Sequence, residues 1–139
     1  MSILTQSTIA NKVSISGIGV HTGNNANINI LPSSPNSGII FKRIDLKHNN
    51  IVIPNFENVS DATLCTTISN DFGVKVSTIE HLMAAFLGLG IDNAVVEIDS
   101  QEIPILDGSA KDFVKILRST GLKSSDVPIK LIKINNNVE

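Results

Sequence analysis

The apolar residues of this chain follow two different spacings, and the order in which these spacings occur restricts the possible folds. Over most of the sequence apolar and polar residues alternate, as in Val13–Ile18 and Ala26–Ile30, which is the period of a strand with one buried face. Two segments in the second half have the period of an α-helix instead. This order predicts an α+β fold, a two-layer domain with a mainly antiparallel sheet and two packed helices.

Further strands are expected wherever a short run of apolar and β-branched residues is bounded by turn residues. These runs are Ile39–Ile44, Ile51–Ile53, Thr63–Ile68, Val74–Val76 and Ala94–Ile98. Gly19–Asn25 and Pro32–Gly38 carry the residues typical of turns, so they are predicted to separate strands. At 139 residues and without an internal repeat, the chain suits one compact domain.

The first helical segment is predicted to begin near Ser77. Its apolar stripe consists of Ile79, Leu82, Met83, Phe86 and Leu87, spaced by one, three or four residues. Ser77 is a candidate N-cap, and Glu80, three residues on, is its partner in a capping box. Gly88 and Gly90 are expected to end the helix.

The second helical segment has an apolar stripe and an oppositely placed charged side. The stripe is Ala110, Phe113, Val114 and Leu117, and the charged side is Lys111, Asp112, Lys115 and Arg118. Ser109 is a candidate N-cap and Gly121 a candidate stop. A charged outer side is what exposure to water predicts for a helix that packs on a sheet.

The first helix lacks such a charged side. His81, Ala84, Ala85 and Gly88 lie away from its stripe, with Glu80 at the margin. Small uncharged residues allow another backbone or a ligand to approach closely. We infer that this face is covered by something outside this chain.

Composition argues against several classes of function. The net charge is -2, and aromatic residues make up 4% with no Trp or Tyr, so neither a basic patch nor a stacking surface for nucleic acid is expected. The single cysteine excludes an internal disulfide. The longest apolar stretch, Leu82–Ile91, is about half of the ~20 residues that a membrane helix needs. We expect a cytoplasmic location, with peripheral attachment to the inner membrane left open, and no integral membrane segment.

Glu80 and His81 are the leading candidates for chemistry, and the residues alone leave two interpretations open. In one, Glu80 only completes a capping box and His81 is a surface residue. In the other, His81 is a zinc ligand and Glu80 is the base that takes a proton from zinc-bound water. The His-Glu-x-x-His signature of metalloproteases is absent, because position 85 is Ala.

Other polar residues are weaker candidates. His21 lies in the glycine-rich turn Gly17–Gly23, which lacks the ending of a phosphate-binding loop, and a structural and a functional interpretation are equally open. Cys65 is expected in a strand interior as a small core residue. His48 is expected in a solvated loop, and Asp107–Ser109 is expected to be the turn that starts the second helix.

The C-terminal part of the sequence suggests a second domain. A polar connection, Lys123–Asp126, leads to Pro128 and to a new alternating segment, Ile129–Ile134. We therefore predict one domain over residues 1–122, and a linker with the first strand of a truncated second domain over residues 123–139.

Four sequence blocks, in order, resemble the UDP-3-O-acyl-N-acetylglucosamine deacetylases of lipid A biosynthesis. They are Gly17–Gly23 (GIGVHTG), Asn36–Arg43 (NSGIIFKR), Thr78–Asn93 (TIEHLMAAFLGLGIDN) and Glu102–Ala110 (EIPILDGSA). The resemblance extends from about Gln6 to the end of the chain, and Val20 is a mild departure from the Leu that many members have.

The resemblance implies a zinc-dependent hydrolase that removes the N-acetyl group of UDP-3-O-(3-hydroxyacyl)-N-acetylglucosamine. It makes His81 the one zinc ligand of this domain and Glu80 the general base. His21 and Val20 would line the substrate cleft, and Cys65 would lie close enough to the metal to bind a second, inhibitory zinc. The other two ligands would come from a His-x-x-x-Asp helix in a second domain.

The implied fold resembles the second domain of ribosomal protein S5 and forms the first half of a two-domain β-α-α-β sandwich. The parent protein would be a monomer with Zn2+ as its cofactor, and this chain alone would be inactive. The alternative from another class is a non-catalytic α+β domain that binds RNA or protein, against which the net charge of -2 counts. A natural short relative and an engineered fragment are equally compatible with the sequence.

Overall fold

The computed structural model describes residues 4–131, 133 and 135. The strands are β1 (Thr5–Ile9), β2 (Val13–Ile18), β3 (Asn25–Pro32), β4 (Ile39–Arg43), β5 (Ile51–Val52), β6 (Val59–Asp61), β7 (Thr67–Ser69), β8 (Lys75–Val76), β9 (Ala94–Ile98) and β10 (Leu122–Pro128). The helices are α1 (Glu80–Leu89), α2 (Lys111–Ser119) and the short 3-10 helix η1 (Phe56–Asn58).

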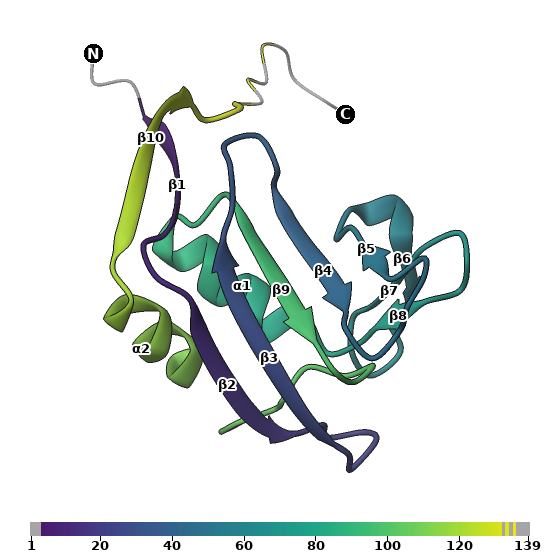
Figure 1. Ribbon diagram of the computed structural model, residues 1–139. Coiled ribbons are helices and arrows are strands. Elements are labelled where there is room, and N and C mark those ends of the chain that lie inside the picture. The colour runs from purple at the N-terminus through teal and green to yellow at the C-terminus, as the bar shows by residue number, and fades with distance from the viewer. Residues whose placement is uncertain (1–3, 132, 134, 136–139) are drawn as a thin grey trace.

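The centre of the fold is a five-stranded sheet in the order β2-β3-β9-β4-β5, and α1 and α2 lie together behind it (Figure 1). All neighbouring strands in this sheet are antiparallel except β4 and β9, which are parallel. A small sheet of β6, β7 and β8 lies beyond the β5 edge, and β1 pairs with β10 in a separate two-stranded sheet. The predicted two-layer α+β fold, mainly antiparallel with two helices, is confirmed.

The core lies between the central sheet and the two helices. Alternating residues of the sheet, including Ile28, Ile30, Val96 and Ile98, are fully buried on the helix side. Leu82 and Phe86 of α1 and Phe113 and Leu117 of α2 meet them from the other layer. Full burial of one such side chain contributes about 1.5–3 kcal/mol. The alternation noted in the sequence therefore places one face of each strand in the core.

The opposite face of the sheet is polar and carries a ladder of small side chains. The Ser14 hydroxyl donates to Asn29 Oδ1 and the Ser16 hydroxyl donates to Asn27 Oδ1, each at 2.7 Å. These cross-strand pairs match the antiparallel register of β2 and β3. The sheet thus has one face for the helices and one for water.

Several predicted strands are confirmed, and others differ. Val13–Ile18 and Ala94–Ile98 have the predicted bounds. The predicted strand Thr63–Ile68 is wrong over its first half, because residues 62–66 form a bend and β7 begins only at Thr67. Cys65 therefore lies in a half-buried loop and not in a strand interior. β1 and β6 were not expected.

The C-terminal segment also differs from the prediction. The expected linker Lys123–Asp126 lies within β10, which pairs antiparallel with β1. Backbone hydrogen bonds to β1 stabilise this strand, although its polar side chains do not show the alternation that predicts a strand. Residues 129–131 and 133, expected in a strand, have no regular structure, and positions 132 and 134 lie outside the described residues. The division at residue 122 stays a prediction.

The predicted capping box of α1 is wrong. Ile79 occupies the N-cap position without a side-chain cap. The Ser77 hydroxyl instead donates to the carbonyl of Gln101 at 3.1 Å, and Glu80 has another partner, described below. At the other end the predicted stop is confirmed at Gly90, which has the left-handed φ of 67°; Gly88 remains inside the helix.

Two residues of α1 lie on the opposite side of the helix from the one predicted. Leu87, expected in the buried stripe, is 84% exposed, whereas Ala85, expected on the open face, is fully buried. The exposed side of α1 therefore carries His81, Ala84, Leu87 and Gly88.

The ends of α2 follow the prediction more closely. The Ser109 hydroxyl accepts the Lys111 N–H at 3.1 Å, although Ala110 occupies the N-cap position. Asp107 bonds to Ser109 in the predicted turn. Within the part of the chain that the structure describes, neither helix is long and apolar enough to cross a membrane.

Candidate active site

Glu80 and His81 occupy the first turn of α1, and the backbone before them is firmly held. The Ser77 N–H donates to the Gln101 carbonyl at 2.8 Å, and the Ile103 N–H donates to the Ser77 carbonyl at 3.1 Å. Thr78 follows with a φ of 57° and is only 2% exposed. This backbone conformation is strained for a β-branched residue, so the surrounding bonds must hold it in place. They fix where α1 begins.

The two oxygens of the Glu80 carboxylate have different surroundings. Oε2 accepts the backbone N–H of Thr66 at 2.9 Å. Oε1 lies 4.0 Å from His81 Nε2. The Glu80 side chain is 37% exposed and the His81 side chain 27% exposed. One oxygen is thus fixed by the 62–66 bend, while the other faces the imidazole at an accessible surface.

His21 lies in the turn between β2 and β3, as predicted, and its backbone is anchored to Glu102. Glu102 Oε1 accepts the His21 N–H at 3.0 Å, and Oε2 accepts the Thr22 N–H at 2.8 Å and the Thr22 hydroxyl at 2.7 Å. Burial raises the pKa of Glu102, but the bonds from Thr22, His21 and Thr78 outweigh it and hold the pKa below its ordinary value. Glu102 is therefore a buried carboxylate that the turn wraps around.

Gly19 shows how closely this turn approaches the carboxylate. A Cβ atom at Gly19 would collide with the Glu102 carboxylate and lie 2.7 Å from Thr22 Oγ1. Both of these groups are fixed by hydrogen bonds to each other. Gly19, the second glycine of the GIGVHTG block, is therefore required by the packing of the turn on Glu102.

A cavity of about 550 Å³ brings two of the predicted site residues together. His21 and Thr22 line it from the β2–β3 turn, Leu64 and Cys65 line it from the 62–66 bend, and Ser77 lines it ahead of α1. Glu80 and His81 are not among its lining residues. Glu80 is connected to the same bend through the Thr66 N–H, so the cavity and the first turn of α1 share one wall.

The remaining predicted residues are placed as follows. Val20 lies beside His21 in the turn and is exposed. His48 is exposed in the loop after β4, as predicted. The contact of Cys65 Sγ in this structure is with Thr67 Oγ1 at 3.7 Å.

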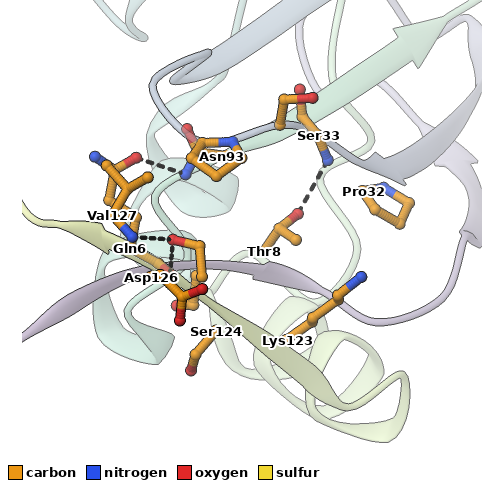
Figure 2. A pocket seen from close by; sticks show the side chains of 13 residues that line it. Gln6, Thr8, Pro32, Ser33, Asn93, Lys123, Ser124, Asp126 and Val127 are labelled. Atoms are coloured by element: carbon orange, nitrogen blue, oxygen red, sulfur yellow. Dashed lines mark hydrogen bonds between the residues drawn. The ribbon is translucent and has the colours of Figure 1, made fainter.

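A second cavity, of about 750 Å³, lies away from all of these residues. It is lined by β1, β10 and the turn after β3, with Gln6, Thr8, Ser33 and Asn93 around it (Figure 2). Its inner polar groups bond to one another: Gln6 accepts from Asn93, and Thr8 accepts the Ser33 N–H. This internal satisfaction indicates a structural joint between the two sheets and not a reactive site.

The described residues do not complete a zinc site by themselves. Among residues 4–131, 133 and 135, no group of three His, Cys, Asp or Glu side chains is placed to hold a metal ion. His81 offers one accessible imidazole, and a catalytic zinc normally has three protein ligands. The described residues therefore offer one of the three protein ligands that such a site has.

Three residues of this region were not singled out by sequence reasoning. Thr66 fixes Glu80 through a backbone group, which a sequence does not display. Thr78 and Glu102 lie inside the blocks that carry the resemblance, and Glu102 is a charged residue beside the apolar run Ile103–Leu106. A carboxylate in such a run is a signal for a buried hydrogen-bonded role.

Comparison with known proteins shows the family of the chain. A family model described as UDP-3-O-acyl N-acetylglycosamine deacetylase, LpxC, matches residues 6–139. Proteins named UDP-3-O-acyl-N-acetylglucosamine deacetylase from Shewanella baltica and Shewanella denitrificans are each 46% identical over 136 residues, and one from Shewanella oneidensis is 44% identical.

These alignments cover 98% of this chain but 44% of each relative, so the chain spans less than half the length of the proteins that it matches. The match includes the turn with His21, the first turn of α1 and the Glu102 segment, which the fold brings together. The chain belongs to the LpxC family of UDP-3-O-acyl N-acetylglycosamine deacetylases.

Proposed function

We propose that this chain supplies one half of the active site of a zinc-dependent deacetylase that releases acetate from UDP-3-O-(3-hydroxyacyl)-N-acetylglucosamine. The observation that carries the proposal is the Glu80–His81 pair, in which one carboxylate oxygen is fixed by Thr66 N–H and the other faces the imidazole. This pair begins a helix whose exposed side carries the uncharged residues Ala84, Leu87 and Gly88. Membership of the deacetylase family supports the substrate class.

Glu80 acts as the general base in this proposal. Its Oε2 is occupied by the Thr66 N–H, so Oε1 accepts the proton of the attacking water. The water oxygen forms a bond to the acetamide carbon, the C–N bond breaks, and an acid returns a proton to the leaving amine. Because the carboxylate is held at one oxygen, it loses little freedom when the other one takes the proton.

His81 holds the metal through one imidazole nitrogen, and Glu80 Oε1 lies 4.0 Å from His81 Nε2, beside the metal position. A bound zinc polarises a carbonyl and lowers the pKa of bound water to about 7. The two remaining ligands and the acid come from residues outside this chain, in a second domain that covers the exposed face of α1. This assignment agrees with the 44% share of the relatives that the chain spans.

The cavity beside the first turn of α1 receives the sugar end of the substrate. His21 and Cys65 both line it, and Val20 is the exposed neighbour of His21 in the β2–β3 turn. In this position Cys65 is the group that takes up a second zinc when the metal is in excess, because a thiolate is a preferred zinc ligand.

The proposal is tested by measuring deacetylation of the UDP-sugar and bound zinc, in a full-length protein that contains this chain and in the 139-residue chain alone. We expect activity and one tightly bound zinc in the longer protein, and neither in the chain alone. His81→Ala in the longer protein should abolish both. Wild-type zinc content and turnover in that variant would contradict the role of His81, and absence of turnover in the unaltered longer protein would contradict the function.

A further inference from the structure

Glu102 joins two segments of the candidate site that are far apart in sequence. Its carboxylate accepts the His21 and Thr22 N–H groups and the Thr22 hydroxyl on one side. On the other side Oε1 accepts the Thr78 hydroxyl at 3.0 Å. Thr78 lies two residues before Glu80. The carboxylate is therefore the shared partner of the β2–β3 turn and of Thr78, the strained residue that precedes α1.

This carboxylate is fully buried, and among the described residues no cation pairs with it. Glu102 is 0% exposed, and the ion pairs found in the described part of the chain do not include it. Burial of an unpaired charge is costly unless several donors replace its water. The four donors from His21, Thr22 and Thr78 provide this replacement, so both segments must keep their positions around the charge.

A glutamine could not take over this arrangement. All four groups at the carboxylate donate hydrogen bonds, and an amide offers one accepting oxygen and an NH2 group that is itself a donor. The close packing of Gly19 against the carboxylate leaves no space for rearrangement. Shape alone would be preserved in Glu102→Gln, but the attraction that draws the two segments together would be lost.

We propose that Glu102 is a positioning residue, which couples the β2–β3 turn to the first turn of α1 and so sets the position of His21 relative to Glu80 and His81. This inference rests on the proposed function for its catalytic consequence. The coupling itself is a property of the chain and is testable without any activity.

The direct test uses NMR spectroscopy and amide hydrogen exchange on the chain, with substitutions on one side of Glu102 and measurement on the other. Thr78→Val removes a hydroxyl donor but keeps the β-branched shape. We expect it to lower the exchange protection of the His21 and Thr22 amides about tenfold, because the carboxylate that accepts from them loses one of the bonds that hold it in position. Thr22→Val should shift the amide and imidazole signals of Glu80 and His81.

Two matched variants serve as controls. Thr78→Ser keeps the hydroxyl and should retain the wild-type protection of the turn. Asp99→Asn alters another carboxylate, which accepts the Asn27 backbone N–H and side-chain amide at 2.7 Å each but is exposed. It should leave the signals of His21, Glu80 and His81 unchanged. If Thr78→Val and Thr22→Val each change only their own segment, Glu102 is a local brace and the coupling is refuted.

The catalytic consequence is measured in a full-length protein that contains this chain. Glu102→Gln should lower kcat about 10- to 100-fold, as displacement of a catalytic group does, while KM stays within about twofold. An unchanged kcat would contradict the positioning role even where the NMR coupling is found. If Glu102→Gln does not fold, the kcat of Thr78→Val and its recovery in Thr78→Ser decide the matter. Absence of activity in the unaltered protein would instead refute the proposed function and leave the NMR test valid.

Discussion

The two helices bury equivalent inner faces but present opposite outer faces. Phe86 and Phe113 are both inserted in the same core, whereas the outer side of α2 carries Lys111, Lys115 and Arg118 and that of α1 carries Ala84, Leu87 and Gly88. Contact with water explains the charged outer side of α2. It does not explain the outer side of α1, because an exposed leucine gains nothing from contact with water. The contrast supports the proposal that α1, and not α2, faces a further domain.

The first turns of the helices sharpen this comparison, since each holds one acidic residue: Glu80 in α1 and Asp112 in α2. In a full-length protein that contains this chain, Glu80→Gln should lower the deacetylation rate about 100- to 10,000-fold, because the amide cannot accept a proton. Asp112→Asn should change the rate less than about twofold. Steady-state kinetics with zinc analysis checks both. Equal effects of the two substitutions would indicate that the acid at this position acts on the helix and not on the substrate.

The inner faces should respond alike. Phe86→Ala and Phe113→Ala each remove a fully buried ring, so each should lower the free energy of unfolding by about 3–5 kcal/mol. Urea denaturation of the 139-residue chain provides the measurement. A loss confined to Phe113→Ala would show that α1 depends on a partner for its packing, and the equivalence of the inner faces would have to be abandoned.

The segments that precede the helices differ in how their carboxylates are held, and this difference predicts a response to pH. Glu102 is buried and accepts a hydrogen bond from Thr78, which precedes α1. Asp107, which precedes α2, is exposed, and hydrogen bonds from the Ser109 hydroxyl and N–H lower its pKa. A carboxyl whose pKa is lower in the folded state stabilises the fold above its ordinary pKa and loses that contribution as pH falls.

Stability of the unaltered chain should therefore decrease as pH falls below about 4.5, the ordinary value for Glu102. Glu102→Gln should lower the free energy of unfolding at pH 7 by about 1–3 kcal/mol and flatten the acid side of the profile. Asp107→Asn should alter the profile less. Thermal unfolding at a series of pH values tests this, and an identical acid slope in Glu102→Gln would show that other carboxylates, such as Asp45 and Asp61, dominate it.

The smallest expected effect concerns the outer faces themselves. Leu87→Lys and Lys115→Leu exchange the character of α1 and α2 at exposed positions, so each should change the free energy of unfolding by less than about 0.5 kcal/mol. Their association should differ in sign: Leu87→Lys should reduce self-association of the chain, and Lys115→Leu should increase it. Sedimentation velocity measures this, and stronger association in Leu87→Lys would count against α1 as the covered helix.

Residue spacing was sufficient to predict the elements that bury a regular face. Ala94–Ile98 was predicted with its observed bounds because its alternation is continuous, and α1 was placed within a few residues by its stripe. The error within α1 is informative: a stripe of five apolar positions included Leu87 and excluded Ala85. A leucine is expected in the core before an alanine because it is larger and more apolar. At this point of α1, however, the tightly packed core holds the smaller Ala85, and Leu87 faces outward.

The parts that were not predicted depend on partners distant in sequence. β10 is polar, so its sequence predicts a linker at Lys123–Asp126, and only its pairing with β1 makes it a strand. Glu80 was expected to bond within its own helix turn, but its partner is the N–H of Thr66, which any residue type could provide. A backbone donor leaves no mark in a sequence. The role of Glu80 as a base remains a prediction, whereas the capping explanation that competed with it is excluded.

The pairing of β1 with β10 has a consequence for how the chain acquires its structure during synthesis. Gln6 and Pro128, which are hydrogen-bonded to each other, are 122 residues apart. Translation proceeds at about 5–20 residues per second, so the first strand leaves the ribosome roughly 6 to 25 s before its partner is made. During this interval its unpaired edge is open to strands of other chains. The domain, and the joint around Gln6, therefore cannot be completed before the ribosome has made β10.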